Sequence, residues 1–360
     1  MTDRDQKSGQ GWLVLLYWAR ERAPAAFANA ILEPVAGDAS NRRYFRLSQR
    51  DGVADEGSAN SLIVVEAPPQ TEKNEAFLAI QEILVAAGIR VPAVLAVDLC
   101  RGYLLLEDLG DNLLLSQLNE SSVDTWYERG LTLCQHLGRV VVSDADNYAL
   151  ANYDQALLSE ELSRFPRWFC EALLNYFFTP DESEIAAKLF GLLIDSALEQ
   201  PQVLVHRDFH SRNLMIDKDD ELAVIDFQDA VRGPLTYDVV SLLRDCYIRW
   251  PRPQVEAWAL AYRNRLRAAN LIEAVDELQF LRWFDLMGLQ RHLKVLGTFA
   301  RLYLRDGKHG YLADLPRVCA YVEEVLALYA PQLPAVAAFQ HWWREHLLPL
   351  MADQPWMQIK

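Results

Sequence analysis

The chain has 360 residues, of which 51% are hydrophobic, so it is long enough for two domains and can bury a large core. A net charge of −15 argues against nucleic acid or an anionic membrane as a partner, because both need basic surface. The five cysteines are widely spaced and include no C-x-x-C pair, which predicts reduced thiols rather than a zinc site or a disulfide framework.

The N-terminal segment shows no targeting or membrane signal. Residues 1–7 lack the charged-then-apolar layout of a secretion signal, and the apolar run Leu13–Ala19 is too short to cross a bilayer. We therefore expect a cytoplasmic protein. Hydrophobic residues at three-to-four spacing predict a helix over residues 11–30.

Five strands and one helix are expected between residues 31 and 107. Short hydrophobic and β-branched runs predict the strands at Leu32–Ala36, Tyr44–Leu47, Leu62–Ala67, Val94–Asp98 and Tyr103–Glu107. The helix lies between the third and fourth strands, with Thr71 as its N-cap and Gly88 as the residue that ends it.

The pattern becomes helical after residue 109. Apolar stripes predict helices near residues 123–141, 158–178, 183–199, 235–249, 253–269, 276–304, 314–330 and 334–347. We therefore predict an α+β fold with two lobes. The smaller, β-rich lobe covers residues 1–109, and the larger helical lobe covers residues 110–360.

A short motif in the second lobe points to phosphoryl transfer. Residues 206–213 read His-Arg-Asp-Phe-His-Ser-Arg-Asn, the H-R-D-x-x-x-x-N pattern of a kinase catalytic loop, and a later strand ends at Asp226. This chemistry needs a carboxylate that orients the acceptor hydroxyl and takes its proton, and hard oxygen ligands that hold Mg²⁺ on the phosphates. Asp208 is the candidate for the first role, and Asn213 and Asp226 are the candidates for the second.

Each of these residues also has a plainer interpretation. Asp208 and Asp226 could be capping or turn residues, and the Asn213 amide could stabilise the turn before the next strand. The joint spacing favours catalysis. Two short apolar strands, Val203–Val205 and Leu222–Ile225, are expected to bring the three side chains together.

The whole chain resembles the aminoglycoside phosphotransferase and choline kinase superfamily, a branch of the protein-kinase-like fold. The segments that carry the resemblance are His206–Asn213, Asp226–Gln228 and Gly233–Asp238. The chain is most similar to the bacterial anomeric sugar kinases, through the phrases at residues 37–46, 226–231 and 288–297.

The resemblance implies an enzyme that uses ATP and Mg²⁺ to phosphorylate the C1 hydroxyl of N-acetylmuramate and N-acetylglucosamine in peptidoglycan recycling. It implies a nucleotide-binding lobe over residues 1–109 and a catalytic and sugar-binding lobe over residues 110–360. No obligate protein partner is evident from the sequence. Two alternatives remain open. One is a phosphotransferase of this fold acting on an aminoglycoside, a choline-like amine or homoserine; the other is a nucleotide-binding regulator with little turnover.

The regulator is considered because the third strand carries Glu66 and no lysine, although the fold normally places a lysine there on the α- and β-phosphates. We expect Arg43 to supply the missing cation, with Arg42 or Arg46 as the alternatives. Strand alternation places Arg43 on one face and both alternatives on the other. A surface role is the plainer interpretation of each arginine.

The other nucleotide contacts are expected at Ser40, Glu107 and Leu109. Ser40 belongs to the turn at residues 37–41, where the resemblance places the phosphate-covering loop, but a single glycine there is weak support. Glu107 and Leu109 follow the fifth strand, where kinases hold adenine through main-chain groups of the interlobe linker. Gly110 is expected to give that linker its turn.

The sugar contacts are expected from the second lobe, at Gln228, Asp229, Arg232, Arg291 and His292. Amide donors suit an acetamido group, and Arg232 or Arg291 could bind a lactyl carboxylate. For each of these residues an exposed or structural role remains the alternative. Asp238 is expected to accept hydrogen bonds from the catalytic-loop backbone, and His210 either packs the loop or contacts substrate.

Overall fold

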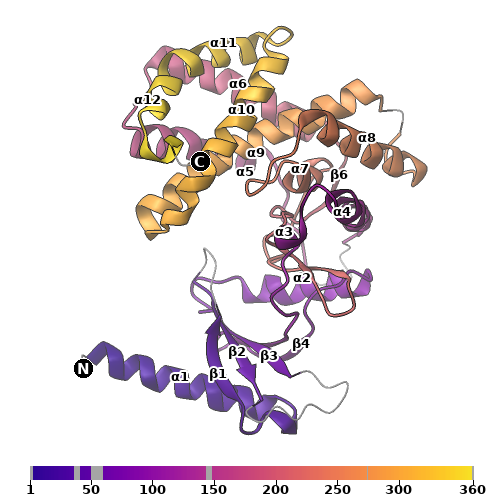
Figure 1. The fold of residues 1–360 in the computed structure, drawn as a ribbon, viewed down its shortest axis with the longest axis vertical. Helices are drawn as coiled ribbons and strands as arrows, with labels where there is room; N and C mark the ends of the chain where they lie inside the picture. Colours follow the sequence, from indigo (N-terminus) through magenta and orange to yellow (C-terminus); the bar gives the residue numbers. More distant parts are fainter. Residues whose placement is uncertain (1–2, 36–40, 50–59, 143–147, 274, 359–360) are drawn as a thin grey trace. The chain divides into compact units, whose positions relative to one another are not determined.

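The computed structural model of the protein describes residues 3–35, 41–49, 60–142, 148–273 and 275–358. The chain divides into two compact units. Unit 1 comprises Met1–Asn112 and Met215–Asp229, and unit 2 comprises Leu113–Leu214 and Ala230–Lys360 (Figure 1). The sequence-based division at residue 109 assigns the segment 215–229 to the second lobe, whereas the structure packs this segment with unit 1.

Unit 1 is built on an antiparallel five-stranded sheet with the strand order β1-β2-β3-β5-β4. Its strands are β1 (Ile31–Val35), β2 (Arg43–Ser48), β3 (Ser61–Glu66), β4 (Val94–Asp98) and β5 (Tyr103–Glu107). All five predicted strands are confirmed. Pro34 is tolerated because β1 lies at an edge of the sheet, where its missing N–H breaks no ladder.

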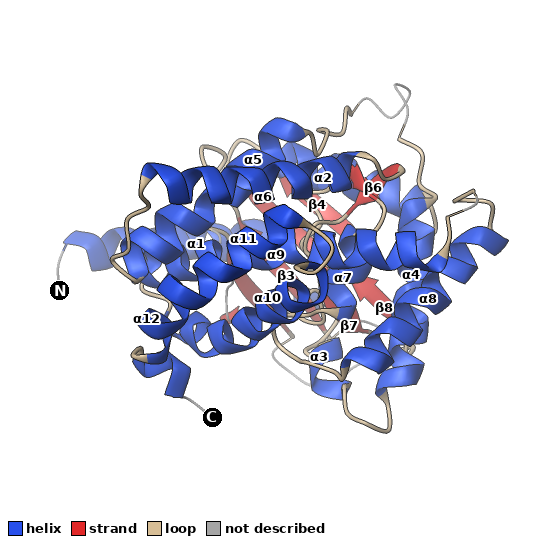
Figure 2. Cartoon of the chain, turned by 90° about the horizontal axis from the view of Figure 1, so that it is seen from above, coloured by secondary structure: helices blue, strands red, loops and turns tan. Residues whose placement is uncertain are grey.

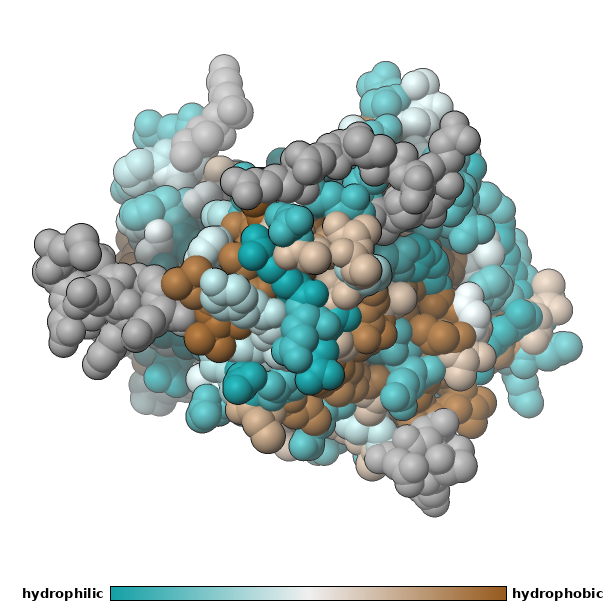
Figure 3. Space-filling model, turned by 90° about the horizontal axis from the view of Figure 1, so that it is seen from below, coloured by the Kyte–Doolittle hydropathy of each residue, from teal (hydrophilic) through white to brown (hydrophobic). Residues whose placement is uncertain are grey.

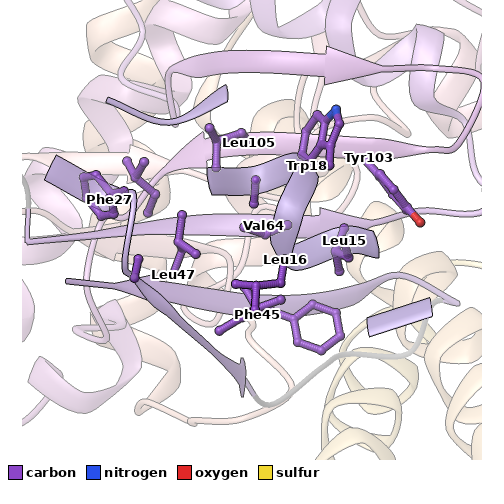
Figure 4. Packing of buried hydrophobic residues seen from close by; sticks show 13 residues of the cluster. Leu15, Leu16, Trp18, Phe27, Phe45, Leu47, Val64, Tyr103 and Leu105 are labelled. Carbon is purple, nitrogen blue, oxygen red and sulfur yellow. The ribbon is translucent and has the colours of Figure 1, made fainter. Parts of the chain in front are cut away.

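Helix α1 (Asp3–Arg22) covers one face of the sheet (Figure 4). Alternate strand residues, including Phe45 and Val64, pack with Leu16 and the Trp18 ring, whose centroid lies 5.5 Å from that of Tyr103. Burial of these side chains is the main force that holds the helix to the sheet.

The helix predicted over residues 11–30 was wrong at both ends. Helix α1 begins at Asp3, in a polar stretch without an apolar stripe, and it ends at Arg22 because Pro24 cannot continue it. A short 3₁₀ turn, η1 (Ala25–Phe27), follows. None of the helices in the described residues is long and apolar enough to cross a membrane.

The outward side of α1 leaves hydrophobic side chains partly exposed. They are Trp12, Leu13, Val14 and Tyr17, of which Tyr17 is 64% exposed. Figure 3 shows one face of the molecule, on which hydrophobic and hydrophilic residues are mixed.

Helix α2 (Asn74–Ala86) connects β3 to β4 and starts later than predicted. Thr71 does not cap it; the Thr71 hydroxyl donates to the Pro68 carbonyl at 3.4 Å, and the Asn74 amide donates to the Ala67 carbonyl at 2.8 Å. Gly88 ends the helix as expected, with a φ of 74° that suits a residue without a Cβ.

A two-stranded hairpin completes unit 1. It consists of β7 (Leu214–Ile216) and β8 (Leu222–Val224). The backbone N–H of Val224 donates to the Arg90 carbonyl at 2.8 Å, and the Phe227 ring stacks on Phe77 of α2 with centroids 4.8 Å apart. These contacts explain why the hairpin packs with unit 1.

The two short strands expected on either side of the loop His206–Asn213 do not pair with each other. Strand β6 (Gln202–Val205) pairs antiparallel with β9 (Val231–Pro234), and β8 pairs with β7. The turn between β7 and β8 is closed by Asp217, whose Oδ1 accepts from the backbone N–H of Asp219 at 2.9 Å. This local hairpin closes a shorter loop than a β6–β8 pair would.

Unit 2 is mainly helical (Figure 2). Its helices include α3 (Leu114–Gln117), α4 (Val123–Gly138), α5 (Gln155–Arg164), the π-helix η3 (Phe165–Leu173), α6 (Pro180–Leu198), α7 (Tyr237–Leu243), α8 (Arg252–Ala268), α9 (Glu277–Asp306), α10 (Leu315–Tyr329), α11 (Pro334–Trp342), the π-helix η5 (Trp343–Leu347) and α12 (Leu348–Ala352). The long helix α9 is buried over most of its length. The helix predicted over residues 235–249 stops at Leu243, and the one predicted over 158–178 is divided into α5 and η3.

Helix α9 approaches η3 so closely that Gly297 leaves no room for a side chain. A Cβ at Gly297 would lie 2.7 Å from the backbone nitrogen of Phe165 and closer still to the carbonyl group of Arg164. We expect Gly297→Ala to destabilise the fold by about 3 kcal/mol or more, because backbone rather than a flexible side chain must move. Thermal unfolding measures the loss.

Gly191 in the middle of α6 is the matched control, since a Cβ there meets no atom within 4 Å. We expect Gly191→Ala to stabilise the protein by about 0.5–1 kcal/mol through helix propensity. Equal effects of the two substitutions would contradict the close approach of α9 to η3.

Candidate active site

The loop His206–Asn213 follows β6 and is held by a buried carboxylate at each end. Near its start, Asp238 Oδ2 accepts from the backbone N–H of His206 at 2.7 Å, and Oδ1 accepts from that of Arg207 at 3.1 Å. Burial raises the pKa of Asp238 to about 6. The predicted structural role of Asp238 is confirmed.

Asp245 holds the later part of the loop. Its Oδ2 accepts from the backbone N–H of Ser211 at 2.9 Å and also from the Ser211 hydroxyl. Asp245 is fully buried and follows α7, the helix on which Asp238 lies. The sequence analysis missed it; the available signal was a second Asp seven residues after Asp238 in an apolar segment.

Asp208 is partly buried in the middle of this fixed loop. Its backbone N–H donates to Nδ1 of His206 at 3.2 Å, and its carbonyl accepts from the Asn213 amide at 3.0 Å. Burial opposes ionisation, but the charges of Lys294 and Arg291 outweigh it and hold the pKa of Asp208 well below its usual range. The carboxylate is therefore anionic at neutral pH.

Asn213 and Asp226 supply the kind of oxygen ligand that Mg²⁺ prefers. The amide nitrogen of Asn213 is used by the Asp208 carbonyl, which leaves the amide oxygen as the atom for a cation. Asp226, in unit 1, follows β8 with a φ of 62°, and its Oδ1 accepts from the Gln228 amide at 2.7 Å. A carboxylate held at a left-handed backbone position indicates local constraint of the kind found at functional sites.

The three arginines at or just before β2 have different surroundings in unit 1. The Arg43 side chain is 64% exposed and forms an ion pair with Glu66, its cross-strand neighbour in the register. Arg42 is buried, with Nε 3.3 Å from Glu72 Oε2 and its guanidinium 5.3 Å from the centroid of the Phe77 ring. The choice of Arg43 as the phosphate ligand stays a prediction, and Ser40 lies outside the described residues.

Arg46 fixes the segment after β5. Its guanidinium binds the Asp108 carboxylate at 2.6 Å and that of Asp111 at 2.8 Å, and Asp108 also accepts from the Ser61 hydroxyl at 2.7 Å. Gly110 has a φ of 88°, so this segment does contain the turn expected of the linker. These contacts hold the backbone on which the adenine contacts are predicted.

The two predicted adenine contacts are anchored within the same segment. The Glu107 carboxylate binds Arg90 at 2.6 Å and accepts from the backbone N–H of Ala93 at 3.1 Å. The hydrogen bond from Arg90 lowers the pKa of Glu107. Leu109 is 9% exposed. The Glu107 side chain is thus engaged within unit 1, so any contact with a nucleotide is left to the main chain.

The predicted sugar contacts are divided between the two units. In unit 1, Asp229 forms an ion pair with Lys73 at 2.6 Å, and Gln228 donates to Asp226. In unit 2, Arg232 is exposed on β9, whereas Arg291 and His292 are buried in α9.

Arg291 and His292 have unlike neighbours because adjacent helical residues point in different directions. Arg291 donates to Sγ of Cys246 at 3.3 Å, and its charge acts on Asp208. The His292 ring stacks on Tyr321 with centroids 4.7 Å apart, and its Nε2 lies 3.0 Å from the Arg244 carbonyl oxygen. Burial lowers the pKa of His292 to about 3, so the ring is neutral.

His210 packs against Tyr247, with ring centroids 5.3 Å apart, and burial lowers its pKa. Sequence reasoning also missed a buried group of charges formed by Glu161 of α5, Arg207 and Lys294 of α9. The available signal was a charged residue in an apolar stripe, since Glu161 lies between Leu158 and Leu162.

Comparisons with known proteins agree with this arrangement. A family model described as "Phosphotransferase enzyme family" matches residues 31–278. The N-acetylmuramate/N-acetylglucosamine kinase of Pseudomonas putida is 41% identical over 295 residues, which cover 82% of this chain and 83% of the relative. The protein of the same name from Neisseria meningitidis is 37% identical over 306 residues, covering 84% and 87%.

Solved structures show the same fold at low identity. An ethanolamine kinase of Plasmodium vivax superposes with a TM-score of 0.62 at 10% identity, covering 86% of each chain. The ADP-bound aminoglycoside phosphotransferase APH(2'')-Ib gives a TM-score of 0.53 at 14% identity, covering 82% of this chain and 94% of the other. The predicted protein-kinase-like α+β fold is confirmed.

The matches with these two sequence relatives cover most of this chain and most of each relative. The family match includes the loop His206–Asn213, both of its anchoring carboxylates and Asp226. The chain therefore belongs to the phosphotransferase enzyme family and is a kinase.

Proposed function

We propose that the protein transfers a phosphoryl group from ATP to the C1 hydroxyl of N-acetylmuramate and N-acetylglucosamine, as a step of peptidoglycan recycling. The observation that carries the proposal is the 41% identity, over 82% of the chain, to a kinase named for these two sugars. The rigid loop around an anionic Asp208 supports the chemistry.

In this proposal Asp208 orients the attacking hydroxyl and accepts its proton. A carboxylate with a strongly lowered pKa is a weak base, so alignment contributes more than proton affinity. This suits an anomeric hydroxyl, which is more acidic than an ordinary alcohol. The backbone hydrogen bonds to Asp238 and Asp245 fix the loop before the reaction begins. The Asp208 carboxylate therefore needs no reorganisation during phosphoryl transfer.

We further propose that Asn213 and Asp226 hold Mg²⁺, which neutralises charge on the transferred phosphoryl group when bound. Arg43, or in its place Arg42, would bind the phosphates of ATP, and the main chain at Glu107 and Leu109 would bind adenine. Ser40 remains part of the predicted nucleotide site. The sugar contacts remain proposed at Gln228, Asp229, Arg232, Arg291 and His292.

An ADP-release assay with Mg·ATP tests the proposed acceptor. We expect turnover with N-acetylmuramate and N-acetylglucosamine, and a product that releases phosphate in mild acid, because a glycosyl phosphate is acid-labile. Kanamycin, choline and homoserine serve as comparison acceptors, since each would give an acid-stable product. Turnover with one of these alone, or an acid-stable sugar phosphate, would contradict the proposed function.

A further inference from the structure

A group of charged side chains is buried beneath the catalytic loop in unit 2. We call it the Glu161 network: Glu161, Arg207, Lys294, Tyr153 and Tyr237. Glu161 and Tyr237 are fully buried, and Lys294 is 7% exposed. Nothing in the proposed chemistry uses Glu161 or Lys294, yet burying such charges is costly unless they are paired.

Glu161 is the centre of the network. Its Oε1 lies 3.1 Å from Nζ of Lys294, and the same oxygen accepts from the Arg207 guanidinium. Its Oε2 accepts from the Tyr153 hydroxyl and from the Gln290 amide at 3.3 Å. Lys294 also donates to the Tyr237 hydroxyl at 3.0 Å.

The network ends at the residue that precedes Asp208. Arg207 has a φ of 74°, a left-handed conformation that is unfavourable for a non-glycine residue and persists only where the surroundings impose it. Two anchors impose it: Asp238 binds the Arg207 backbone N–H, and Glu161 binds the Arg207 guanidinium. Loss of the Glu161 anchor would let the backbone relax and move Asp208.

The cations of the network act on Asp208 as well as on Glu161. Arg207 and Lys294 both bind the Glu161 carboxylate, and the positive charges of both also stabilise the Asp208 carboxylate. Burial opposes the ionisation of Glu161, but Lys294 and Arg207 lower its pKa to about 2. Among the neighbouring charges, Lys294 does most to keep Asp208 anionic.

We propose that Lys294 and Glu161 are positioning residues for catalysis: they hold Arg207 in its left-handed conformation and thereby fix Asp208 against the acceptor hydroxyl. This inference rests on the proposed function for the identity of the acceptor and for the role of Asp208. Neither residue touches substrate in this proposal, so both act on the chemical step and not on binding.

The test separates kcat from KM. We expect Lys294→Met and Glu161→Gln each to lower kcat by about 10²-fold, the size of effect that misplacing a reacting group by about 1 Å produces. The KM values for ATP and for the sugar should stay within about twofold. Rates are expressed per nucleotide-binding site, counted by calorimetry, so that unfolded protein does not contribute.

Asp285→Asn is the matched control. Asp285 is as buried as Glu161 and lies on α9 with Lys294; it binds Arg252 at 2.6 and 2.7 Å and accepts from the Tyr329 hydroxyl at 3.0 Å. We expect this variant to lose thermal stability as Glu161→Gln does, but to keep its kcat. If Asp285→Asn loses as much kcat as Glu161→Gln does, the loss comes from lower stability in general and not from the positioning of Asp208. That result would overturn the proposal.

Tyr237→Phe keeps the test decisive if the charge variants fail to fold. It removes only the hydroxyl that accepts from Lys294, and we expect a fall in kcat of about fivefold with unchanged KM values. An unchanged kcat in Tyr237→Phe, or a rise in the KM values without a fall in kcat, would overturn the proposal. If the wild-type protein does not phosphorylate the amino sugars, the proposed function is contradicted but this inference is not. The ratio of each variant's kcat to the wild-type kcat can then be measured with whichever acceptor the protein does phosphorylate.

Discussion

Asp208→Asn should lower kcat by about 10³–10⁴-fold, the upper part of the range for loss of a positioned acid or base. The amide keeps the size of the side chain but cannot accept the proton of the hydroxyl. ATP binding should change little, because Asn213 and Asp226 are left in place. Single-turnover kinetics measures the rate, and calorimetry with Mg·ATP measures the binding.

The control is Asp195→Asn, at an exposed position on α6. This variant should match the wild type in rate and in binding. If Asp208→Asn retains more than a tenth of the wild-type kcat, Asp208 is not the base. If it loses ATP binding as well, the residue acts through the structure of the loop.

Asp226→Asn should lower the rate at 1 mM Mg²⁺ by about 10³-fold, since a bound cation supplies several kcal/mol of charge stabilisation. We expect part of the loss to be recovered as Mg²⁺ or Mn²⁺ is raised, because a weakened site fills at higher metal concentration. The measurement is kcat as a function of free metal at saturating ATP.

Asp219→Asn provides the comparison within the same hairpin. Asp219 is exposed in the turn between β7 and β8, so its loss should leave the metal dependence unchanged. An Asp226→Asn variant whose metal dependence equals that of the wild type would remove Asp226 from the metal site, whatever its rate.

The strands of unit 1 could be predicted because their signals are local. Each hydrophobic run is short and is bounded by proline, glycine or polar residues, as Pro68 bounds β3. The start of α1 could not be predicted, because residues 3–10 have no apolar stripe. The widened turns of η3 were missed for another reason: a 3.6-residue period does not distinguish a π-helix from an α-helix.

In the candidate site, too, the residues with local sequence signals could be predicted and those that depend on long-range packing could not. The structural role of Asp238 could be predicted, and Asp208 and Asn213 could be proposed as site residues, because their spacing along one segment carries the information. Glu161 and Lys294 lie far apart in the sequence, and their ion pair depends on the packing of α5 against α9. Similarly, alternation along residues 42–47 predicted that Arg43 and Arg46 point to opposite faces, but not that Arg42, which precedes β2, would pair with Glu72.

The segment Met215–Asp229 belongs to unit 1 although it is synthesised long after the rest of that unit. A ribosome that has finished Asn112 must add 117 further residues (229 − 112) before unit 1 is complete. At about 5–20 residues per second this takes roughly 6–23 s. Throughout that interval the nascent sheet lacks the hairpin, and Phe77 lacks the ring on which it stacks. A chaperone that binds exposed aromatic side chains would therefore find Phe77 of α2 accessible until Phe227 has been added.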